Sequence, residues 1–401
     1  MATIHVLSPK QNIKGTRIFL RVDWNIPLSA MDAVDSLKVS RSMETVIGLA
    51  KRGAVVIVAT HLGRPTGREM KYSTKKLEEQ ITWQYNVNVN FIDAVLDTKT
   101  GLEKAQRIIT EASPGTVFLL ENVRFYAGEE KNTPSLAKAY ASLAEVFVND
   151  AFASCHRKHA SVVGIAKLLP SYAGPQLVAE VEALQKLITK PKKPFVAIIG
   201  GAKISTKIGV IEALLKTASK VYIGGAMANA FFKAKKWEIG TSYVEKEGVA
   251  MAKKLLKNKN IILPIDVVVA KKKIDKNAKA TTALTDKVKK NEAIGDIGPL
   301  TMQAWSADIR EAETIVWNGP LGVSEFPSFS HGSLVIAQAI AVRSKGKAFG
   351  VIGGGDTLPV ALATGMSEWY DHMSMGGGAM LEFLTEKGAL PGIVALQRKS
   401  A

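Results

Sequence analysis

The chain has 401 residues, of which 47% are hydrophobic and 22% are charged, and its formal net charge is +17. This composition excludes a mainly disordered chain, and the length predicts two domains because one hydrophobic core seldom serves more than about 250–300 residues. The sequence has no apolar run of about 18 residues, no secretory signal at its start and one cysteine, so we expect a cytoplasmic protein without a membrane span or an internal disulfide.

Apolar, β-rich runs recur along the chain with helical patterns between them. Their spacing leaves room for the helical crossovers that parallel strands need. We therefore predict an α/β fold with two doubly wound, Rossmann-like parallel-sheet domains joined by a helix and hinge. The predicted strands are Arg17–Val22, Val55–Ala59, Val87–Ile92, Val117–Leu120, Val146–Val148, Phe195–Ile199, Lys220–Ile223, Ile261–Val269, Thr314–Val316 and Ala348–Ile352.

A helical pattern over Leu177–Leu187, followed by the breaker-rich Thr189–Pro194, indicates the boundary between the domains. We predict a first domain over residues 1–175, an interdomain helix and linker over residues 176–193, and a second domain over residues 194–386.

Polar and basic side chains follow the predicted strands of the first half. Ligands of parallel sheets bind beyond the carboxyl ends of the strands, and guanidinium groups grip phosphate or carboxylate in bidentate fashion. One arginine alone is typical of a rim salt bridge, whereas several at successive strand ends favour a pocket for a small anion. The residues concerned are Asp23, Asn25, His61, Arg64, Asn122, Arg124, Asn149, Asp150, His156, Arg157 and His159.

Glycines take the corresponding positions in the second half. They let a flat or polyphosphate ligand lie against the backbone. Neither a Walker A loop nor a dinucleotide-binding G-x-G-x-x-G motif occurs. The strand ends read Gly200-Gly201, Gly224-Gly225, Asn318-Gly319-Pro320 and Gly353-Gly354-Gly355-Asp356-Thr357.

The stretch Phe195–Leu215 combines a buried strand, a glycine pair and a helical apolar stripe. Lys203 and Lys207 are four residues apart, so they share one face if the segment is helical, and two ammonium groups beside a helix N-terminus suit a polyphosphate. The alternative is a surface helix with two solvated lysines. Asp356 is either a helix N-cap or, beside a nucleotide, a Mg²⁺ ligand. An anion pocket in one lobe and nucleotide-type glycine loops in the other predict phosphoryl transfer.

Several motifs, in order and spacing, resemble those of the phosphoglycerate kinase family. They extend from about Arg17 to the C-terminus, and HLGRP, GGAKISTK and WNGPLG together are highly specific. The motifs are RVDWN, HLGRP, LLENVRF, VNDAF with HRKHAS, GGAKISTKIGVIE, DIGP, WNGPLGVSEFP, GGGDT and GGGAMLEFL with LPGIVAL.

The resemblance implies reversible phosphoryl transfer between ATP and the carboxylate of 3-phosphoglycerate, a glycolytic step, by a monomer that uses Mg²⁺. It implies that the first domain binds 3-phosphoglycerate, that the second binds the nucleotide, and that the tail 387–401 packs back on the first domain. It places Ser374 and Gly376–Gly378 in the hinge.

The resemblance also assigns a role to individual residues. The implied ligands of 3-phosphoglycerate are Asp23 and Asn25 at its hydroxyl region and His61, Arg64, Arg124 and Arg157 at its phosphate. The implied catalytic residues are Lys38, Lys203 and Lys207. The implied nucleotide ligands are Lys207, Gly224, Gly225, Asn318, Val323, Glu325, Gly354, Gly355, Asp356 and Thr357, with Asp356 also holding Mg²⁺.

The chain departs from the family pattern at Lys38, where the family has an arginine that helps to stabilise the transferring group. Lysine keeps the charge and loses the planar fork, which predicts a slower kinase unless Arg41, on the same helix face, substitutes. Met375 replaces a threonine of the hinge motif, and Ile294-Gly295 alters the expected adenine wall. For Cys155 beside His156, a buried incidental cysteine is favoured over a nucleophile.

Two alternatives compete with this interpretation. The first is a basic module that binds nucleic acid or another polyanion, which the net charge of +17 suggests. The lysine clusters lack interleaved aromatic residues, which favours a solvated face, so we expect no nucleic-acid partner and no membrane partner. The second is a two-lobed kinase that acts on another small phosphorylated acid.

Overall fold

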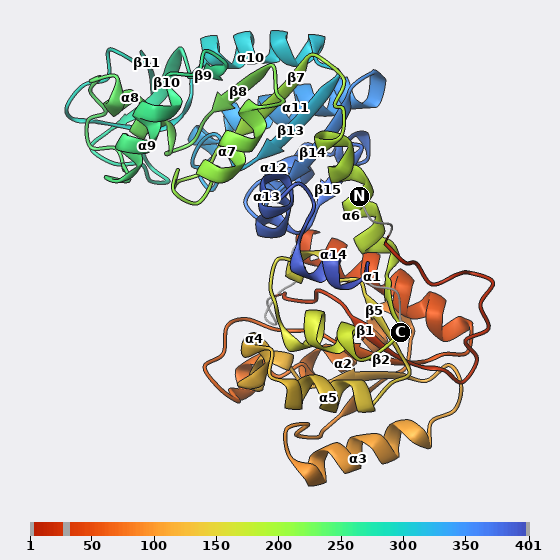
Figure 1. The fold of residues 1–401 in the computed structure, drawn as a ribbon. Helices are drawn as coiled ribbons and strands as arrows, with labels where there is room; N and C mark the ends of the chain where they lie inside the picture. The colour runs from red at the N-terminus through yellow and green to blue at the C-terminus, as the bar shows by residue number, and fades with distance from the viewer. Residues whose placement is uncertain (1–3, 27–32, 398–401) are drawn as a thin grey trace. The chain divides into compact units, whose positions relative to one another are not determined.

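The computed structural model describes residues 4–26 and 33–397, except for the side chains of residues 33–36. The chain forms two compact units, Met1–Val181 with Ala389–Ala401, and Glu182–Gly388 (Figure 1). Each unit is built on a six-stranded parallel sheet, so the predicted α/β fold with two parallel-sheet domains is confirmed. The unit boundary falls within the helix α6 (Pro175–Ile188).

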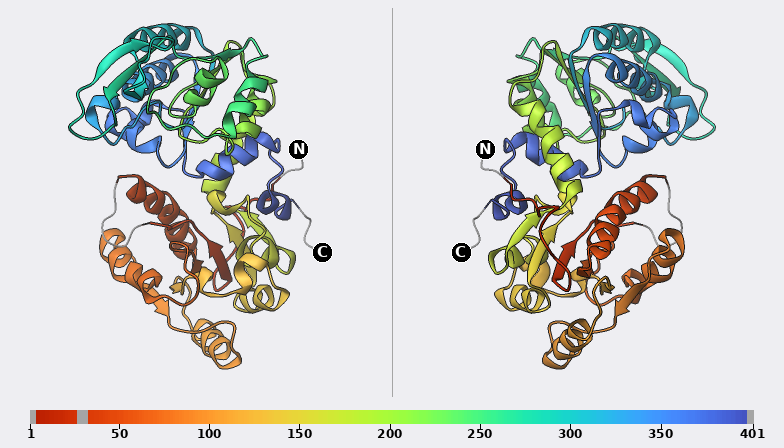
Figure 2. Two further views of the ribbon diagram at one scale, coloured as in Figure 1. Left: turned by 90° about the vertical axis from the view of Figure 1, so that its left-hand side faces the viewer. Right: turned by 90° about the vertical axis from the view of Figure 1, so that its right-hand side faces the viewer.

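The sheet of the first unit has the strand order β3-β4-β2-β1-β5-β6, with every pair parallel. Its central strands are buried along their length, as expected for strands covered on both faces by helices (Figure 2). The strands are β1 (Arg17–Arg21), β2 (Val55–Ala59), β3 (Val89–Ile92), β4 (Val117–Leu120), β5 (Val146–Asn149) and β6 (Ser171–Ala173). The helices are α1 (Ala33–Lys51), α2 (Lys75–Tyr85), α3 (Lys99–Thr110), α4 (Gly128–Lys131) and α5 (Pro134–Ser142).

The large sheet of the second unit has the order β15-β14-β13-β7-β8-β9, again with parallel pairs. Its strands are β7 (Phe195–Ile199), β8 (Lys220–Ile223), β9 (Ile261–Ile262), β13 (Thr314–Asn318), β14 (Phe349–Gly353) and β15 (His372–Ser374). The helices are α7 (Ile208–Leu215), α8 (Ala228–Ala234), α9 (Gly248–Leu255), α10 (Pro299–Glu311), α11 (His331–Gly346), α12 (Leu358–Ala363) and α13 (Gly377–Thr385).

The strand predicted over Ile261–Val269 is wrong. The chain instead forms the short β9, breaks at Pro264 and resumes as β10 (Asp266–Lys271), because proline has no backbone N–H to give to a ladder. β10 leaves the large sheet and pairs antiparallel with β11 (Thr281–Leu284) and β12 (Glu292–Ile297). The apolar run of residues 267–269 suits a strand of either sheet, so it did not reveal the change.

The expectation of a helix that carries both Lys203 and Lys207 is also wrong. Helix α7 begins at Ile208, with Lys207 as its N-cap residue at φ −125° and ψ −1°, and Lys203 lies in the preceding loop. The two lysines therefore do not share a helix face. Likewise, Asp356 lies one residue before Thr357, the N-cap of α12.

The C-terminal segment belongs to the first unit. After α13 the chain passes to α14 (Pro391–Ala395), where the Gly392 N–H donates to the Cys155 carbonyl at 2.8 Å. A side chain at Gly392 would meet the Cys155 backbone at 2.9 Å, so glycine permits this close approach. Across the described part of the chain, none of the helices combines the length and apolar character needed to cross a membrane.

Candidate active site

The loops after β1 and β2 lie against each other at the carboxyl edge of the first sheet. The Asn25 side-chain oxygen accepts a hydrogen bond from the Gly63 N–H at 2.8 Å, and the Arg124 guanidinium donates to the Gly63 carbonyl at 2.8 Å. Gly63 has φ +58°, and a Cβ there would meet the Tyr72 ring at 2.4 Å. The HLGRP turn is thus held in one conformation by side chains from two other strand ends.

His61 is buried beside this turn and lies among charged groups. Its Nδ1 is 3.1 Å from a terminal nitrogen of Arg21 and 3.9 Å from a carboxylate oxygen of Asp23. Burial, followed by the charges of Arg21, Arg124, His159 and Lys38, holds the pKa of His61 well below 6.5. The same result places Lys38, on α1, within electrostatic reach of His61.

The basic residues predicted at the strand ends influence one another. Burial, and then the charges of Arg21, Arg124, Arg157 and His156, lower the pKa of His159 to about 4. Burial also lowers the pKa of Arg124, to which the neighbouring Arg64 contributes. Arg124 lies 3.7 Å from the Glu130 carboxylate, and the Arg157 Nε donates to the His156 ring at 2.8 Å. The first unit thus brings Arg124 close to the buried imidazoles of His61 and His159, with Arg157 beside His159 and Arg64 beside Arg124.

Four glycine-containing loops meet at the carboxyl edge of the second sheet. Gly201, Gly225, Gly319 and Gly354 all have positive φ, between +64° and +111°. A Cβ at Gly200 would lie 2.2 Å from the Pro320 carbonyl, so these backbones touch directly.

Asn318 and Thr357 connect two of these loops through side-chain hydrogen bonds. Both are buried; the Asn318 amide donates to the Gly353 carbonyl at 2.8 Å, and the Thr357 hydroxyl accepts from the Gly319 N–H at 2.7 Å. They support the loops and do not line the pocket described next.

Lys207 reaches back from the start of α7 to two of these loops. Its ammonium donates to the Gly200 carbonyl at 2.7 Å and to the Asn318 side-chain oxygen at 2.8 Å. Burial lowers the pKa of Lys207 from 10.5 to about 8, and the nearby Asp356 carboxylate partly opposes this shift. Lys203 is exposed. Hydrogen bonds from Ser205 lower the pKa of Glu245, and the charge of Lys203 adds to this lowering.

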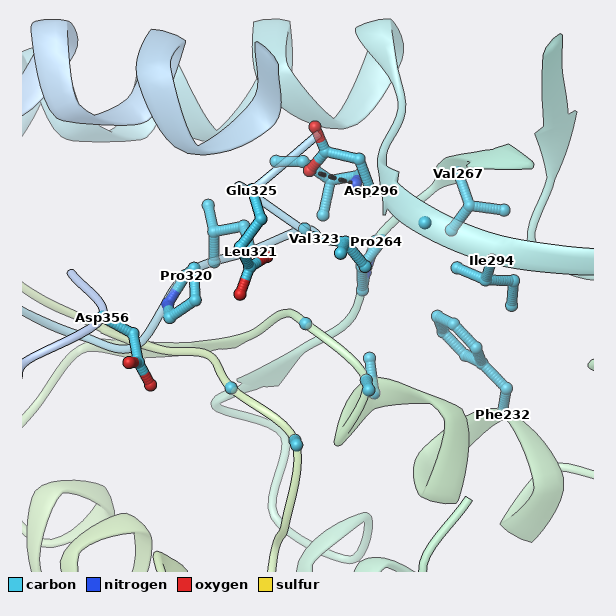
Figure 3. A pocket seen from close by; sticks show the side chains of 18 residues that line it. Phe232, Pro264, Val267, Ile294, Asp296, Pro320, Leu321, Val323, Glu325 and Asp356 are labelled. Atoms are coloured by element: carbon cyan, nitrogen blue, oxygen red, sulfur yellow. Dashed lines mark hydrogen bonds between the residues drawn. The ribbon is translucent and has the colours of Figure 1, made fainter. Parts of the chain in front are cut away.

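A pocket opens beside the loops of the second unit (Figure 3). Asp356 lies at one end, and the apolar side chains of Phe232, Ile294 and Val267 lie at the other. Glu325 and Val323 lie between them. The pocket therefore has an apolar end, of the kind that can receive an aromatic base, and an end that carries the Asp356 carboxylate.

Ile294 and Gly295, which depart from the family pattern, both line this pocket. A Cβ at Gly295 would meet the Phe329 ring at 2.3 Å, so the packing of Phe329 accounts for the glycine.

A family model described as phosphoglycerate kinase matches residues 9–387. The chain is 42% identical to "Phosphoglycerate kinase" of Thermus thermophilus over 99% of this chain and 100% of that one, and 40% identical to the same-named protein of Thermosipho africanus over 97% and 96%. The chain belongs to the phosphoglycerate kinase family.

Solved structures of the family have the same fold. The phosphoglycerate kinase from Coxiella burnetii superposes with a TM-score of 0.82 at 37% identity, covering 96% of this chain and 97% of that one. The enzyme from Pyrococcus horikoshii gives 0.84 at 29% identity with the same coverage. The phosphoglycerate kinase fold expected from the motifs is therefore confirmed.

Sequence reasoning missed two groups of residues. Phe232, Pro264 and Val267 line the nucleotide-type pocket but lie outside the glycine motifs. Arg21 is 1% exposed beneath the basic cluster of the first unit. The available signal was the arginine that follows the apolar run Ile18–Leu20, because an arginine needs a polar partner when it is buried.

Cys155 is fully buried, as the incidental interpretation predicts. Burial raises the pKa of its thiol to about 12, so the thiolate that a nucleophile needs is scarce at neutral pH.

Proposed function

We propose that the basic cluster of the first unit binds 3-phosphoglycerate and that the pocket of the second unit binds ATP or ADP. Reversible phosphoryl transfer between ATP and the carboxylate of 3-phosphoglycerate, a step of glycolysis, is the activity of the family to which the chain belongs. The observation that carries the substrate assignment is that Arg124 and Arg157 lie close enough to His159 to lower its pKa, with Arg64 beside Arg124. Like charges repel, and an anionic ligand relieves that repulsion.

On the first unit, we assign recognition of the substrate to groups that lie close together at the strand ends. Arg64, Arg124 and Arg157 bind the phosphate, for which planar guanidinium forks are suited, and His61 contributes a further contact. Asp23 and Asn25 bind the hydroxyl region of the glycerate. Lys38 supplies positive charge near His61, and we assign this charge to the stabilisation of the transferring group.

On the second unit, the apolar end of the pocket receives the adenine and Glu325 bonds the ribose. Gly224, Gly225 and Val323 form the wall of the adenine site. Lys207 and Lys203 meet the phosphates, with Lys203 following the transferred group. The backbone of Gly354, Gly355 and Thr357 faces the phosphate chain, beside Asn318.

The residues at the acidic end also fit Mg²⁺. Asp356 is exposed in the loop before α12 and presents one carboxylate, and Mg²⁺ bound to a nucleotide uses one or two carboxylates together with phosphate oxygens. When bound, Mg²⁺ neutralises charge on the phosphate oxygens. Within the described residues, no group of three or more His, Cys, Asp or Glu could hold a metal by itself.

Phosphoryl transfer requires little covalent chemistry from the side chains of the protein. The transition state is loose, so positive charge and in-line positioning supply most of the catalysis. The attacking carboxylate is already ionised at neutral pH, so no general base is required. Transfer needs the two bound substrates to come together, and we assign Ser374, Met375 and Gly376–Gly378 to the hinge that permits it.

A coupled assay of ATP formation from 1,3-bisphosphoglycerate and ADP tests this proposal. We expect turnover with KM values in the micromolar-to-millimolar range. An Arg124→Met variant should raise KM for 3-phosphoglycerate at least about tenfold, since a charged hydrogen bond contributes about 1.5–3 kcal/mol. Absence of turnover together with steeply salt-dependent DNA binding would instead support the polyanion-binding alternative, and turnover only with another phosphorylated acid would support the other kinase.

We also propose that the protein is a cytoplasmic monomer with the domain limits expected from the sequence. Light scattering on the full chain tests the monomeric state.

A further inference from the structure

A buried polar network lies directly beneath the basic cluster of the first unit. Arg21, in β1, donates from Nε to the Ser161 hydroxyl at 3.0 Å. The Ser161 hydroxyl in turn donates to the Glu129 carboxylate at 2.5 Å, and the Ser161 N–H donates to its other oxygen at 3.1 Å. Arg21 is 1% exposed and Glu129 is 0% exposed, so the pair is a compensated charge inside the unit.

The same guanidinium contacts His61. A terminal nitrogen of Arg21 lies 3.1 Å from the His61 Nδ1. Arginine has only donors, so Nδ1 must carry the lone pair that accepts this hydrogen bond. Asp23, at 3.9 Å from Nδ1, is too distant to accept a hydrogen bond from it. An imidazolium, or a tautomer with hydrogen on Nδ1, would place two donors against each other.

The other ring nitrogen of His61 is left for a ligand. Among the residues that the structure describes, none forms a hydrogen bond with Nε2. If Nδ1 accepts from Arg21 and the ring is neutral, Nε2 carries the proton and donates.

We propose that Arg21, held by Ser161 and Glu129, is a positioning residue that fixes His61 as the neutral tautomer with hydrogen on Nε2. His61 then meets the phosphorylated acid as an uncharged hydrogen-bond donor among charged guanidinium groups. This inference rests on the proposed function, in which His61 contacts 3-phosphoglycerate.

The charges around His61 act in the same direction. Arg21 faces it from β1, Lys38 from α1, Arg124 from the turn after β4 and His159 from the loop before residues 160–164. Asp23 is the one carboxylate within 4 Å of its ring in the described residues. Burial and these cations lower the pKa of His61, so they favour the neutral imidazole, and substrate binding does not depend on a positive charge at this ring.

The first test is ring-nitrogen NMR of the full chain, with the other histidines as internal references. We expect an unprotonated Nδ1 and a protonated Nε2 for His61, unchanged from pH 8 to pH 5.5. A hydrogen on Nδ1, or an imidazolium at pH 6, would overturn the inference. Added 3-phosphoglycerate should shift the Nε2 signal; a correct tautomer without that shift would count against the proposed function and leave the tautomer assignment intact.

The second test compares variants by their KM for 3-phosphoglycerate. Arg21→Met with Glu129→Gln removes both buried charges together, which avoids leaving one unpaired. In this variant His61 can become protonated as the pH falls, and the imidazolium binds the anionic substrate more tightly. The ratio of KM at pH 7.5 to KM at pH 5.5 should therefore be about tenfold larger than in the wild type, with kcat little changed. Arg21→Lys keeps a donor to Nδ1 and should restore the wild-type profile.

A profile of the double variant that parallels the wild type would refute the positioning role. If the double variant does not fold, the tautomer measured in the wild type still decides.

Discussion

The depressed pKa of Lys207 predicts a stability cost that is visible without any ligand. The lowering from 10.5 to about 8 corresponds to about 3 kcal/mol of differential interaction between the charged and neutral forms. Between pH 8 and pH 10.5 the unfolded chain binds a proton at this lysine that the folded chain does not. The free energy of unfolding should therefore rise with pH through that window, and the cost is largest below it.

A Lys207→Met variant isolates this contribution. From pH 7 to pH 9.5, the unfolding free energy of the wild type should rise by about 2 kcal/mol relative to that of the variant. Urea unfolding at the two pH values measures it. Lys203→Met is the matched control, because Lys203 is exposed and lies in the same loop, and it should show no such shift. Equal differences at both pH values would refute the argument.

Nucleotide binding should reverse the shift. Phosphate oxygens beside the ammonium favour its charged form, so the pKa of Lys207 rises on binding. At pH 8.5 the wild type should take up about 0.7 proton per bound nucleotide, whereas Lys207→Met takes up none. Calorimetry of ADP binding in two buffers of different ionisation enthalpy measures the uptake. An uptake equal in both proteins would show that Lys207 does not meet the phosphates.

Four further predictions follow from the described residues. Lys38→Arg should raise kcat about tenfold, since it restores a second charged hydrogen bond to the transferring group; an unchanged kcat in the coupled assay would argue against the guanidinium fork as the cause. Gly200→Ala should destabilise the second unit by about 1–3 kcal/mol in urea unfolding, because its Cβ would lie 2.2 Å from the Pro320 carbonyl, whereas Gly378→Ala meets nothing within 4 Å and should be neutral or stabilising. Asp356→Asn should weaken Mg²⁺-dependent ADP binding about tenfold or more with little effect on ADP binding without the metal, which titration calorimetry distinguishes. Cys155, buried and with its pKa raised to about 12, should react with a thiol reagent at pH 8 only after unfolding, and rapid reaction of the native chain would contradict its burial.

The parallel sheets and the positions of the candidate site residues could be predicted from the sequence. Apolar runs such as Val55–Ala59 and Phe195–Ile199 became fully buried strands, because burial on both faces of a parallel sheet requires continuous apolar residues. The residues that follow such strands were then predictable as site candidates. Gly63 and Arg124, from different motifs, do meet there at 2.8 Å.

The points at which helices and strands begin and end depend on contacts between distant parts of the chain. The apolar stripe after Gly201 predicted a helix that included Lys207, yet α7 begins one residue later. The Lys207 ammonium bonds to Asn318, 111 residues away in the chain, which no local pattern encodes. The division of residues 261–269 between two sheets depends in the same way on which strands lie beside β10.

Which charged residues become buried likewise depends on the tertiary structure. In the sequence, Glu129 belongs to an ordinary polar stretch, GEEK, and Arg21 to a strand end. The fold brings Arg21 to Ser161, 140 residues away, and encloses the pair with Glu129. Residue type and spacing state which groups a chain carries, but desolvation and hydrogen-bond partners come from distant segments, and these set the protonation state of His61 and Lys207.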